Sequence, residues 1–199
     1  MACGLAFASS AWATSCPDAD TQAAGLSQDR LENSITCLIN EQRTSFGLDP
    51  VQPNGTLRRA ALSHSNEMVD ESYFEHTSPS GLTFIQRIES AGYMRGARAW
   101  IVGENLVWGS GALSSPGALV TAWMNSPPHR ENLLKARFRE IGVAAVSGTP
   151  ESASDLTGTT VSSEYGFRLN GKKKATAHKA KAHKKSRKRA RRHKHRRHH

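Results

Sequence analysis

The last 28 residues of the chain cannot contribute to a hydrophobic core, so any globular fold must lie before them. Lys172–His199 contain 15 Lys and Arg, six His and no Asp or Glu, and alanine is their only apolar residue type. Such a segment cannot bury enough apolar surface to offset the entropy lost on ordering. We therefore expect residues 170–199 to form a disordered basic tail. The remainder of the 199-residue chain has room for one domain of ordinary size.

The net charge is divided between these two parts. The whole chain has 27 Lys and Arg against 17 Asp and Glu, and removing the 15 of the tail leaves 12 against 17, so residues 1–171 carry −5. We expect residues 172–199 to bind anionic polymers or an acidic membrane surface in a salt-sensitive manner. Nucleic acid is not the expected partner in vivo, because export, which the N-terminus indicates, favours envelope polymers over genomic DNA. The tail also has no aromatic residue to stack on bases, so its binding should not depend on sequence. The alternative is a tail that only aids solubility.

The N-terminus indicates export. Residues 1–13, MACGLAFASSAWA, are small and apolar and end in an A-x-A pattern of the kind that signal peptidase cleaves. They are too short to span a bilayer, which needs about 20 apolar residues. We interpret them as the end of a signal peptide whose start lies upstream, with an Ala/Ser-rich terminus or a lipoprotein lipidated at Cys16 as alternatives. The expected location is secreted, extracellular or in the cell envelope.

The cysteine count agrees with export. Cys3 would leave with the signal peptide, and Cys16 and Cys37 then remain as an even pair. An oxidising compartment would join them, which pins an N-terminal arm, expected over residues 14–32, to the following helix. The alternative is one buried and one exposed thiol.

Helical patterns come first in the domain and strand patterns last. Apolar spacing predicts helices from Ile35 to a stop at Gly47, after an Asn54 cap, around Phe84–Ile88, and after a Ser115 cap with Pro116 at the first position. A short turn is expected near Asn132. The remaining predictions are a short strand or its approach at 100–102, a strand around 141–145, a hairpin loop at 148–158 and a returning strand at 159–168. Helices followed by paired strands indicate an α+β domain.

Three polar residues could converge on a cleft. His64 lies on the apolar face of its predicted helix, Glu104 follows a buried strand, and His129 follows a Pro-Pro pair. Two imidazoles and a carboxylate suit a divalent metal such as zinc, with water completing an open site. The alternative is structural: His64 as a satisfied core histidine, Glu104 bonded to loop amides and His129 capping a turn.

Several blocks of the sequence resemble the bacterial CAP (SCP-like, PR-1-like) domain, in the order that is typical of that family. They are HSNEM at 64–68, YFEHTSPSG at 73–81, RIESAGY at 87–93, GENL at 103–106, and WMNSPPHRENLL at 123–134 followed by REIGV at 139–143. The resemblance implies a three-layer α-β-α sandwich with a central antiparallel sheet over residues 33–169.

The resemblance also implies a cleft with two His and two Glu, where some members bind a metal. His64, Glu104 and His129 match three of these positions, and Ser126 stands at the fourth, which removes a carboxylate ligand. No G-x-S-x-G motif supports a Ser126–His129 nucleophile. His76 is a further polar candidate at the cleft mouth, or a loop histidine that bonds within a turn.

The sequence thus predicts a secreted, monomeric CAP-domain protein. Its cleft would bind a small apolar ligand or a divalent metal, and its tail would anchor it to anionic envelope surfaces. The family implies no established reaction. The alternatives are a metal-assisted hydrolase or protease that uses the cleft residues, and a structural envelope protein that acts through its tail.

Overall fold

The structure, a computed structural model, describes residues 16–170. The expected signal peptide and, apart from Asn170, the expected tail lie outside these residues. Among the described residues, no helix is long and apolar enough to cross a membrane.

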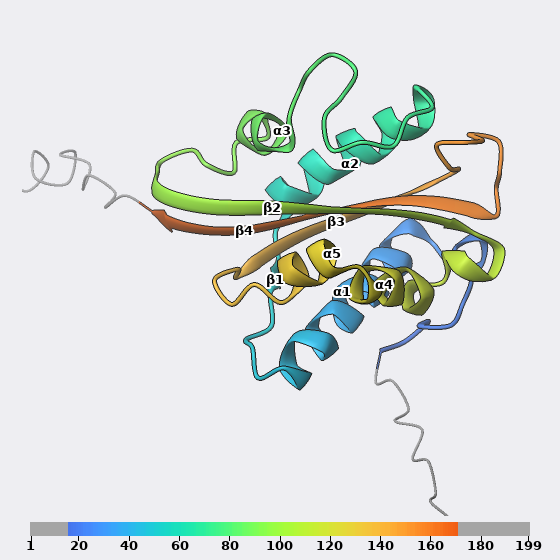
Figure 1. Ribbon diagram of the computed structural model, residues 1–199, viewed down its shortest axis with the longest axis horizontal. Helices are drawn as coiled ribbons and strands as arrows, with labels where there is room; N and C mark the ends of the chain where they lie inside the picture. Colours follow the sequence, from blue (N-terminus) through green and yellow to red (C-terminus); the bar gives the residue numbers. More distant parts are fainter. Residues whose placement is uncertain (1–15, 171–199) are drawn as a thin grey trace, which may run out of the picture.

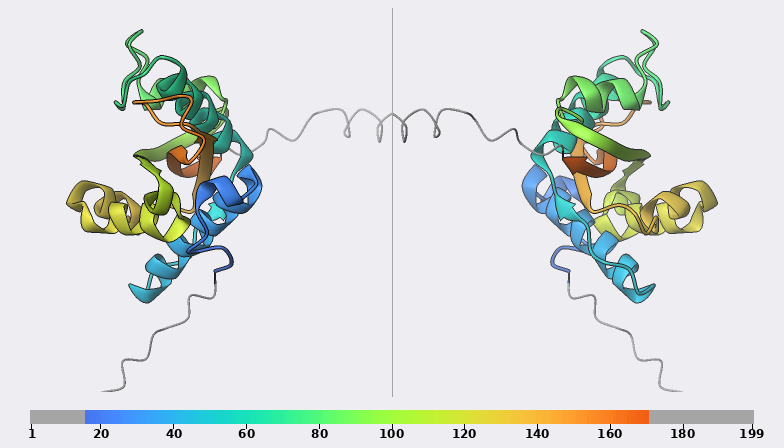
Figure 2. Two further views of the ribbon diagram at one scale, coloured as in Figure 1. Left: turned by 90° about the vertical axis from the view of Figure 1, so that its right-hand side faces the viewer. Right: turned by 90° about the vertical axis from the view of Figure 1, so that its left-hand side faces the viewer.

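A sheet lies between two layers of helices, which confirms the expected α-β-α sandwich (Figures 1 and 2). One face is covered by α2 (Gly55–Asp70) and α3 (Phe84–Ser90), and the other by α1 (Gln28–Ser45), α4 (Pro116–Asn125) and α5 (Pro127–Leu133). The strands within residues 16–170 are β1 (Gln52–Pro53), β2 (Ala97–Ser110), β3 (Glu140–Ser147) and β4 (Gly158–Asn170), in the order β1-β3-β4-β2. Two short 3₁₀ turns, Ala23–Gly25 and Gly111–Ser114, complete the described elements.

The sheet is antiparallel except at one edge. β4 pairs antiparallel with both β3 and β2, whereas the two-residue β1 pairs parallel with the start of β3. β2 is much longer than the apolar run at 100–102 that predicted a strand. Glycines within it weaken the strand signal, yet a Cβ at Gly103 would lie 2.9 Å from the Phe138 ring, so close packing requires glycine there.

Two helices differ from the sequence prediction. The N-terminal arm expected over residues 14–32 is shorter, because Ser27 caps α1 by accepting a hydrogen bond from the Arg30 amide, and the helix begins at Gln28. The turn expected near Asn132 is the seven-residue helix α5, which begins at Pro127. Proline is well tolerated at the first helical position, because that position needs no amide donor.

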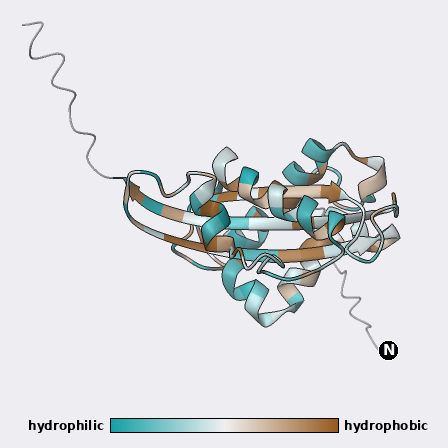
Figure 3. Ribbon diagram, turned by 90° about the horizontal axis from the view of Figure 1, so that it is seen from above, coloured by the Kyte–Doolittle hydropathy of each residue, from teal (hydrophilic) through white to brown (hydrophobic). Residues whose placement is uncertain are grey.

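The main hydrophobic core lies between the sheet and the layer of α1, α4 and α5. Its largest buried side chains include Trp123, Tyr165 and Phe138. Seen from above, hydrophobic residues run along the strands (Figure 3). On the opposite sheet face, a Cβ at Gly142 would lie only 2.0 Å from the Arg58 amide nitrogen of α2. Because α2 approaches so closely, its polar side chains reach the sheet.

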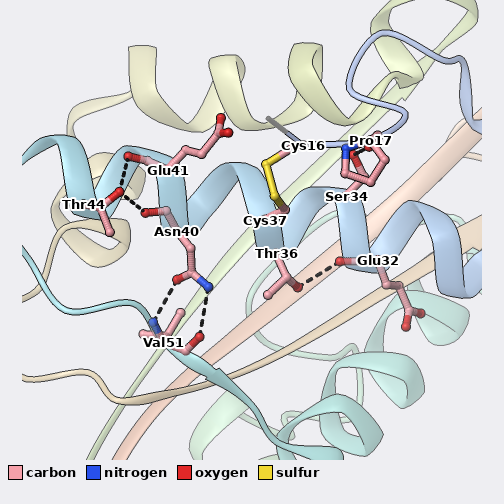
Figure 4. The surroundings of a disulfide bond; sticks show 10 residues. All are labelled: Cys16, Pro17, Glu32, Ser34, Thr36, Cys37, Asn40, Glu41, Thr44 and Val51. Atoms are coloured by element: carbon pink, nitrogen blue, oxygen red, sulfur yellow. Dashed lines mark hydrogen bonds between the residues drawn. A yellow bond between two sulfur atoms is a disulfide. The ribbon is translucent and has the colours of Figure 1, made fainter. Parts of the chain in front are cut away.

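Cys16 and Cys37 form the expected disulfide, with Cα atoms 5.7 Å apart (Figure 4). Cys37 lies in the middle of α1, so the bridge fastens the arm to that helix. Neighbouring contacts support it: Ser34 donates to the Pro17 carbonyl at 2.7 Å, and Arg30 pairs with Asp18.

Removing the disulfide should destabilise the domain without changing its fold. The bridge spans 21 residues of sequence, and the chain-entropy model gives a loop of this size about 3 kcal/mol. The double substitution Cys16→Ser/Cys37→Ser should therefore lower the free energy of unfolding by about this amount in denaturant titrations. Reducing agent should destabilise the unmodified chain equally and leave the variant unchanged. Equal stability of the two chains under oxidising conditions would contradict this account.

Candidate functional site

Glu104 lies in the middle of β2, directly opposite Glu164 of β4. Side chains alternate along a strand, and Gly103 faces Phe138, so Glu104 points to the face covered by α2 and α3. Only 3% of its surface is exposed. The strand that the sequence predicted only in part thus places a carboxylate inside the protein.

Arg87 of α3 neutralises this carboxylate. Its Nη2 donates to Glu104 Oε2 at 2.8 Å and to the His76 carbonyl at 2.9 Å, while Nη1 donates to the Leu82 carbonyl at 2.9 Å. Both members of the ion pair are almost fully buried. One guanidinium therefore holds α3, the loop before it and β2 together.

His76 binds the other oxygen of the same carboxylate. Its Nδ1 lies 2.8 Å from Glu104 Oε1, and 52% of its side chain is exposed. This hydrogen bond raises the pKa of His76. Burial by itself would raise the pKa of Glu104, but hydrogen bonds from His76 and Glu164 and the charge of Arg87 lower it on balance. His76 thus belongs to the site and reaches solvent at its mouth.

His64 of α2 is fully buried, and both of its ring nitrogens are engaged. Nε2 lies 3.0 Å from the Glu75 carbonyl, and Nδ1 lies 3.3 Å from the Tyr73 hydroxyl and 3.5 Å from Glu67 Oε2. Burial lowers the pKa of His64, although the charge of Glu104 opposes this. A neutral ring that donates from Nε2 to the Glu75 carbonyl and accepts at Nδ1 from the Tyr73 hydroxyl satisfies both ring nitrogens, while Glu67 Oε2 accepts from the Ser78 hydroxyl at 2.7 Å. The geometry matches the satisfied core histidine that the sequence left as an alternative.

Glu164 is completely buried. If it were ionised, neither carboxylate oxygen would have a hydrogen-bond donor among the described residues. Burial and the adjacent negative charge of Glu104 raise the pKa of Glu164 well above its ordinary value. A protonated Glu164 that donates to Glu104 accounts for both observations, so the two strands hold one proton between two carboxyl groups.

His129 lies on α5, which covers the sheet face opposite to α2 and α3, next to the edge strand β2. Its Nδ1 is 2.8 Å from the hydroxyl of Ser126, and its carbonyl accepts from Asn105 Nδ2 at 2.9 Å. Burial lowers the pKa of His129, and the positive charge of His76 lowers it further. His76 and His129 are therefore within electrostatic reach of each other, and both are partly exposed.

The predicted ligands His64, Glu104 and His129 do not form a metal site in this arrangement. Among residues 16–170, the one group of three or more possible ligand atoms within 4.8 Å of one another is Cys16, Cys37 and Glu41, whose thiols form the disulfide. The oxygens of Glu104 are bound by Arg87 and His76, and a divalent cation would have to compete with the buried guanidinium. The donor types suit zinc, but in this arrangement they are not gathered around one point.

The sequence interpretation missed Arg87 and Glu164 as site residues. Arg87 lies next to Ile88 in the short helix that apolar spacing predicted. A charged residue beside buried apolar residues could have indicated that its side chain is buried too. Val161, Ser163 and Tyr165 share one face of their predicted strand, and the alternation of side chains predicted that Glu164 lies on the opposite face. Nothing in the sequence paired it with Glu104, because strand register appears only once the sheet is assembled.

Comparisons with known proteins agree with this fold. Residues 37–165 match the model of the cysteine-rich secretory protein family. The uncharacterized protein YkwD of Bacillus subtilis is 35% identical over 139 residues, which are 70% of this chain and 51% of that protein. This chain therefore spans about half the length of that relative.

Two solved structures have the same architecture. An extracellular protein of Bacillus anthracis that contains an SCP domain is 25% identical with a TM-score of 0.52, and the match covers 70% of this chain and 43% of the other. An outer surface protein of Borrelia burgdorferi is 24% identical with a TM-score of 0.56, and the match covers 68% and 90% of the two chains. At that identity the second match shows the fold alone.

Zinc should not bind at the predicted ligands. We expect a chain that ends at Asn170, and therefore lacks the histidines of the tail, to show no change in Tm when zinc is added. The reason is that Arg87 already neutralises Glu104. A rise in Tm that disappears in His64→Ala or His129→Ala would contradict this result.

Replacing Glu164 by Gln should stabilise the domain at neutral pH. The raised pKa means that Glu164 keeps its proton when folded and loses it on unfolding above pH 4.5, so stability falls as pH rises from there. For each pH unit between the pKa of Glu164 in the unfolded chain and its pKa in the folded chain, the free energy of unfolding falls by about 1.4 kcal/mol. Glu164→Gln should therefore recover about 1 kcal/mol or more at neutral pH.

The gain should vanish in acid, when the unfolded chain is also protonated. Glu151→Gln, on the exposed β3–β4 loop, is the matched control and should change stability little. A Glu164→Gln variant that is less stable at neutral pH would show that the ionised carboxylate is required.

Proposed function

The chain belongs to the cysteine-rich secretory protein (CAP) family, and from this premise we propose that it is an exported binding protein held at anionic envelope surfaces by its basic C-terminal segment. The disulfide favours an oxidising compartment outside the cytoplasm. The names of two structural neighbours describe them as an extracellular and an outer surface protein. The A-x-A pattern at residues 11–13 agrees with export.

Binding rather than catalysis is the role of the cleft. The observation that carries this conclusion is that both oxygens of Glu104 are engaged, by Arg87 and by His76. A general base needs a carboxylate that can reach substrate, and this one is buried in an ion pair. His76 and His129 reach solvent and can hydrogen-bond a small ligand.

A hydrolase based on Ser126 and His129 has less support. Their 2.8 Å contact resembles a nucleophile and its base. Within residues 16–170, however, His129 has no carboxylate hydrogen-bond partner to orient it, as such pairs require. Ser126 directly precedes α5 and His129 lies in the first turn of that helix, so the contact is a local one at the start of the helix.

The charge of residues 172–199 supports anchoring. Fifteen Lys and Arg without any acidic residue attract polyanions. The range of this attraction is about one Debye length, which is about 8 Å at physiological salt. The six histidines have an ordinary pKa near 6.5, so acidification adds positive charge and tightens binding.

Anchoring is tested by comparing the full chain with a chain that ends at Asn170. On immobilised polyphosphate at low salt, the full chain should bind at least about tenfold more tightly, and the difference should shrink as salt is raised. The shorter chain keeps the described core and the disulfide, so its Tm should stay close to that of the full chain. Equal binding by both chains, or affinity that does not fall with salt, would refute anchoring by the tail.

A further inference from the structure

The end of the sheet where β4 leaves the domain projects beyond the other strands. β3 begins at Glu140, which pairs with Gly166, whereas β4 continues to Asn170. Beyond that point β2 and β4 form a two-stranded ribbon, seen at the left of Figure 1. Asn170 is the last described residue, and the basic tail begins two residues later. The chain therefore leaves the domain at this end.

This end is basic although the domain is acidic overall. Six of the twelve Lys and Arg in residues 16–170 belong to the segments that meet here: Arg95, Arg98, Lys135, Arg137, Arg139 and Arg168. The Arg139 amide donates to the Gly166 carbonyl at 3.0 Å, which places the α5–β3 loop beside the ribbon. Two acidic side chains contact this group, Glu140 beside Arg168 and Asp49 beside Arg139. A net positive surface remains, and we call these six residues the basic end.

Two large apolar side chains are exposed on the same ribbon. Trp100 is 45% exposed and Leu169 is 53% exposed. Trp100 pairs with Arg168, and Leu169 pairs with the adjacent Ala99, so Trp100 and Leu169 point to opposite faces of the ribbon. An exposed tryptophan among arginines suits the interface of a bilayer, where the ring enters the headgroup region and the guanidinium groups meet phosphates.

We propose that the basic end docks on an anionic phospholipid bilayer, with Trp100 and Leu169 entering the headgroup interface. This inference rests on the proposed anchoring function and names its partner. A bilayer fits better than a soluble polyanion, because a polyanion offers no apolar phase to exposed tryptophan and leucine. Charge complementarity and the exit of the basic tail at this end orient the domain on the surface.

The test measures binding of the full chain to vesicles of phosphatidylcholine with and without phosphatidylglycerol. Trp100→Ser/Leu169→Ser should lower the partition coefficient on the anionic vesicles about tenfold, from the apolar area that no longer enters the interface. Leu113→Ser/Leu156→Ser is the matched control, since those leucines are 70% and 74% exposed at the opposite end of β2 and β4. It should change partitioning less than about twofold.

A second measurement tests directly whether Trp100 enters the bilayer. Lipids with brominated acyl chains should quench the fluorescence of the full chain, and the change Trp100→Phe should remove most of that quenching. Because all the substituted side chains are exposed, near-ultraviolet circular dichroism and Tm should stay close to those of the unmodified chain.

The outcomes separate this inference from the anchoring function. Equal partitioning of the two double variants, or quenching that survives Trp100→Phe, would overturn docking by the basic end, even if the full chain still binds polyphosphate through its tail. If the Trp100/Leu169 variant lost polyphosphate binding as strongly as vesicle binding, the partner would be a polymer and the bilayer proposal would be wrong.

Discussion

The buried ion pair between Arg87 and Glu104 is the interaction on which the site depends. Through one guanidinium, α3 and the carbonyls of His76 and Leu82 are fixed to the middle of β2. Removing either partner would leave an uncompensated charge in a dry environment, which typically costs about 3–5 kcal/mol. The loop that carries the partly exposed His76 therefore owes its position to this pair.

Close packing of α2 on the sheet explains why polar groups accumulate there. Gly142 lets the backbone of α2 approach β3, and Ser65 then reaches Ser162 and the Ala144 carbonyl. On this face an apolar cluster that includes Leu57, Ile88 and Tyr93 lies beside polar side chains that bond one another. Each buried polar group needs its partner, since an unsatisfied one costs about 1–3 kcal/mol. Among the described residues, the carboxyl group of Glu164 finds a partner in Glu104 when it carries a proton, whereas Arg87 Nε on this face has none.

Sequence patterns predicted some of this arrangement and not the rest, for physical reasons. The burial of His64 followed from its helical spacing with Leu57, Ala61 and Met68, and the disulfide followed from counting cysteines in a chain that was expected to be exported. The pairing of Arg87 with Glu104 could not be predicted, because it joins a helix to a strand whose packing depends on the whole domain. The structural role of each carboxylate likewise depends on which residue the strand register sets opposite it.

The two regions for which we propose functions lie at separate places along β2. Glu104 is seven residues from Ala97, and at about 3.3 Å per residue its Cα lies about 23 Å from the start of the strand at the basic end. A domain that stands on its basic end would therefore hold the cleft roughly 20 Å above the surface, well beyond a Debye length at physiological salt. A ligand would then approach His76 and His129 from solvent without strong influence from the anionic surface. Anchoring and ligand binding can thus operate independently on one small domain.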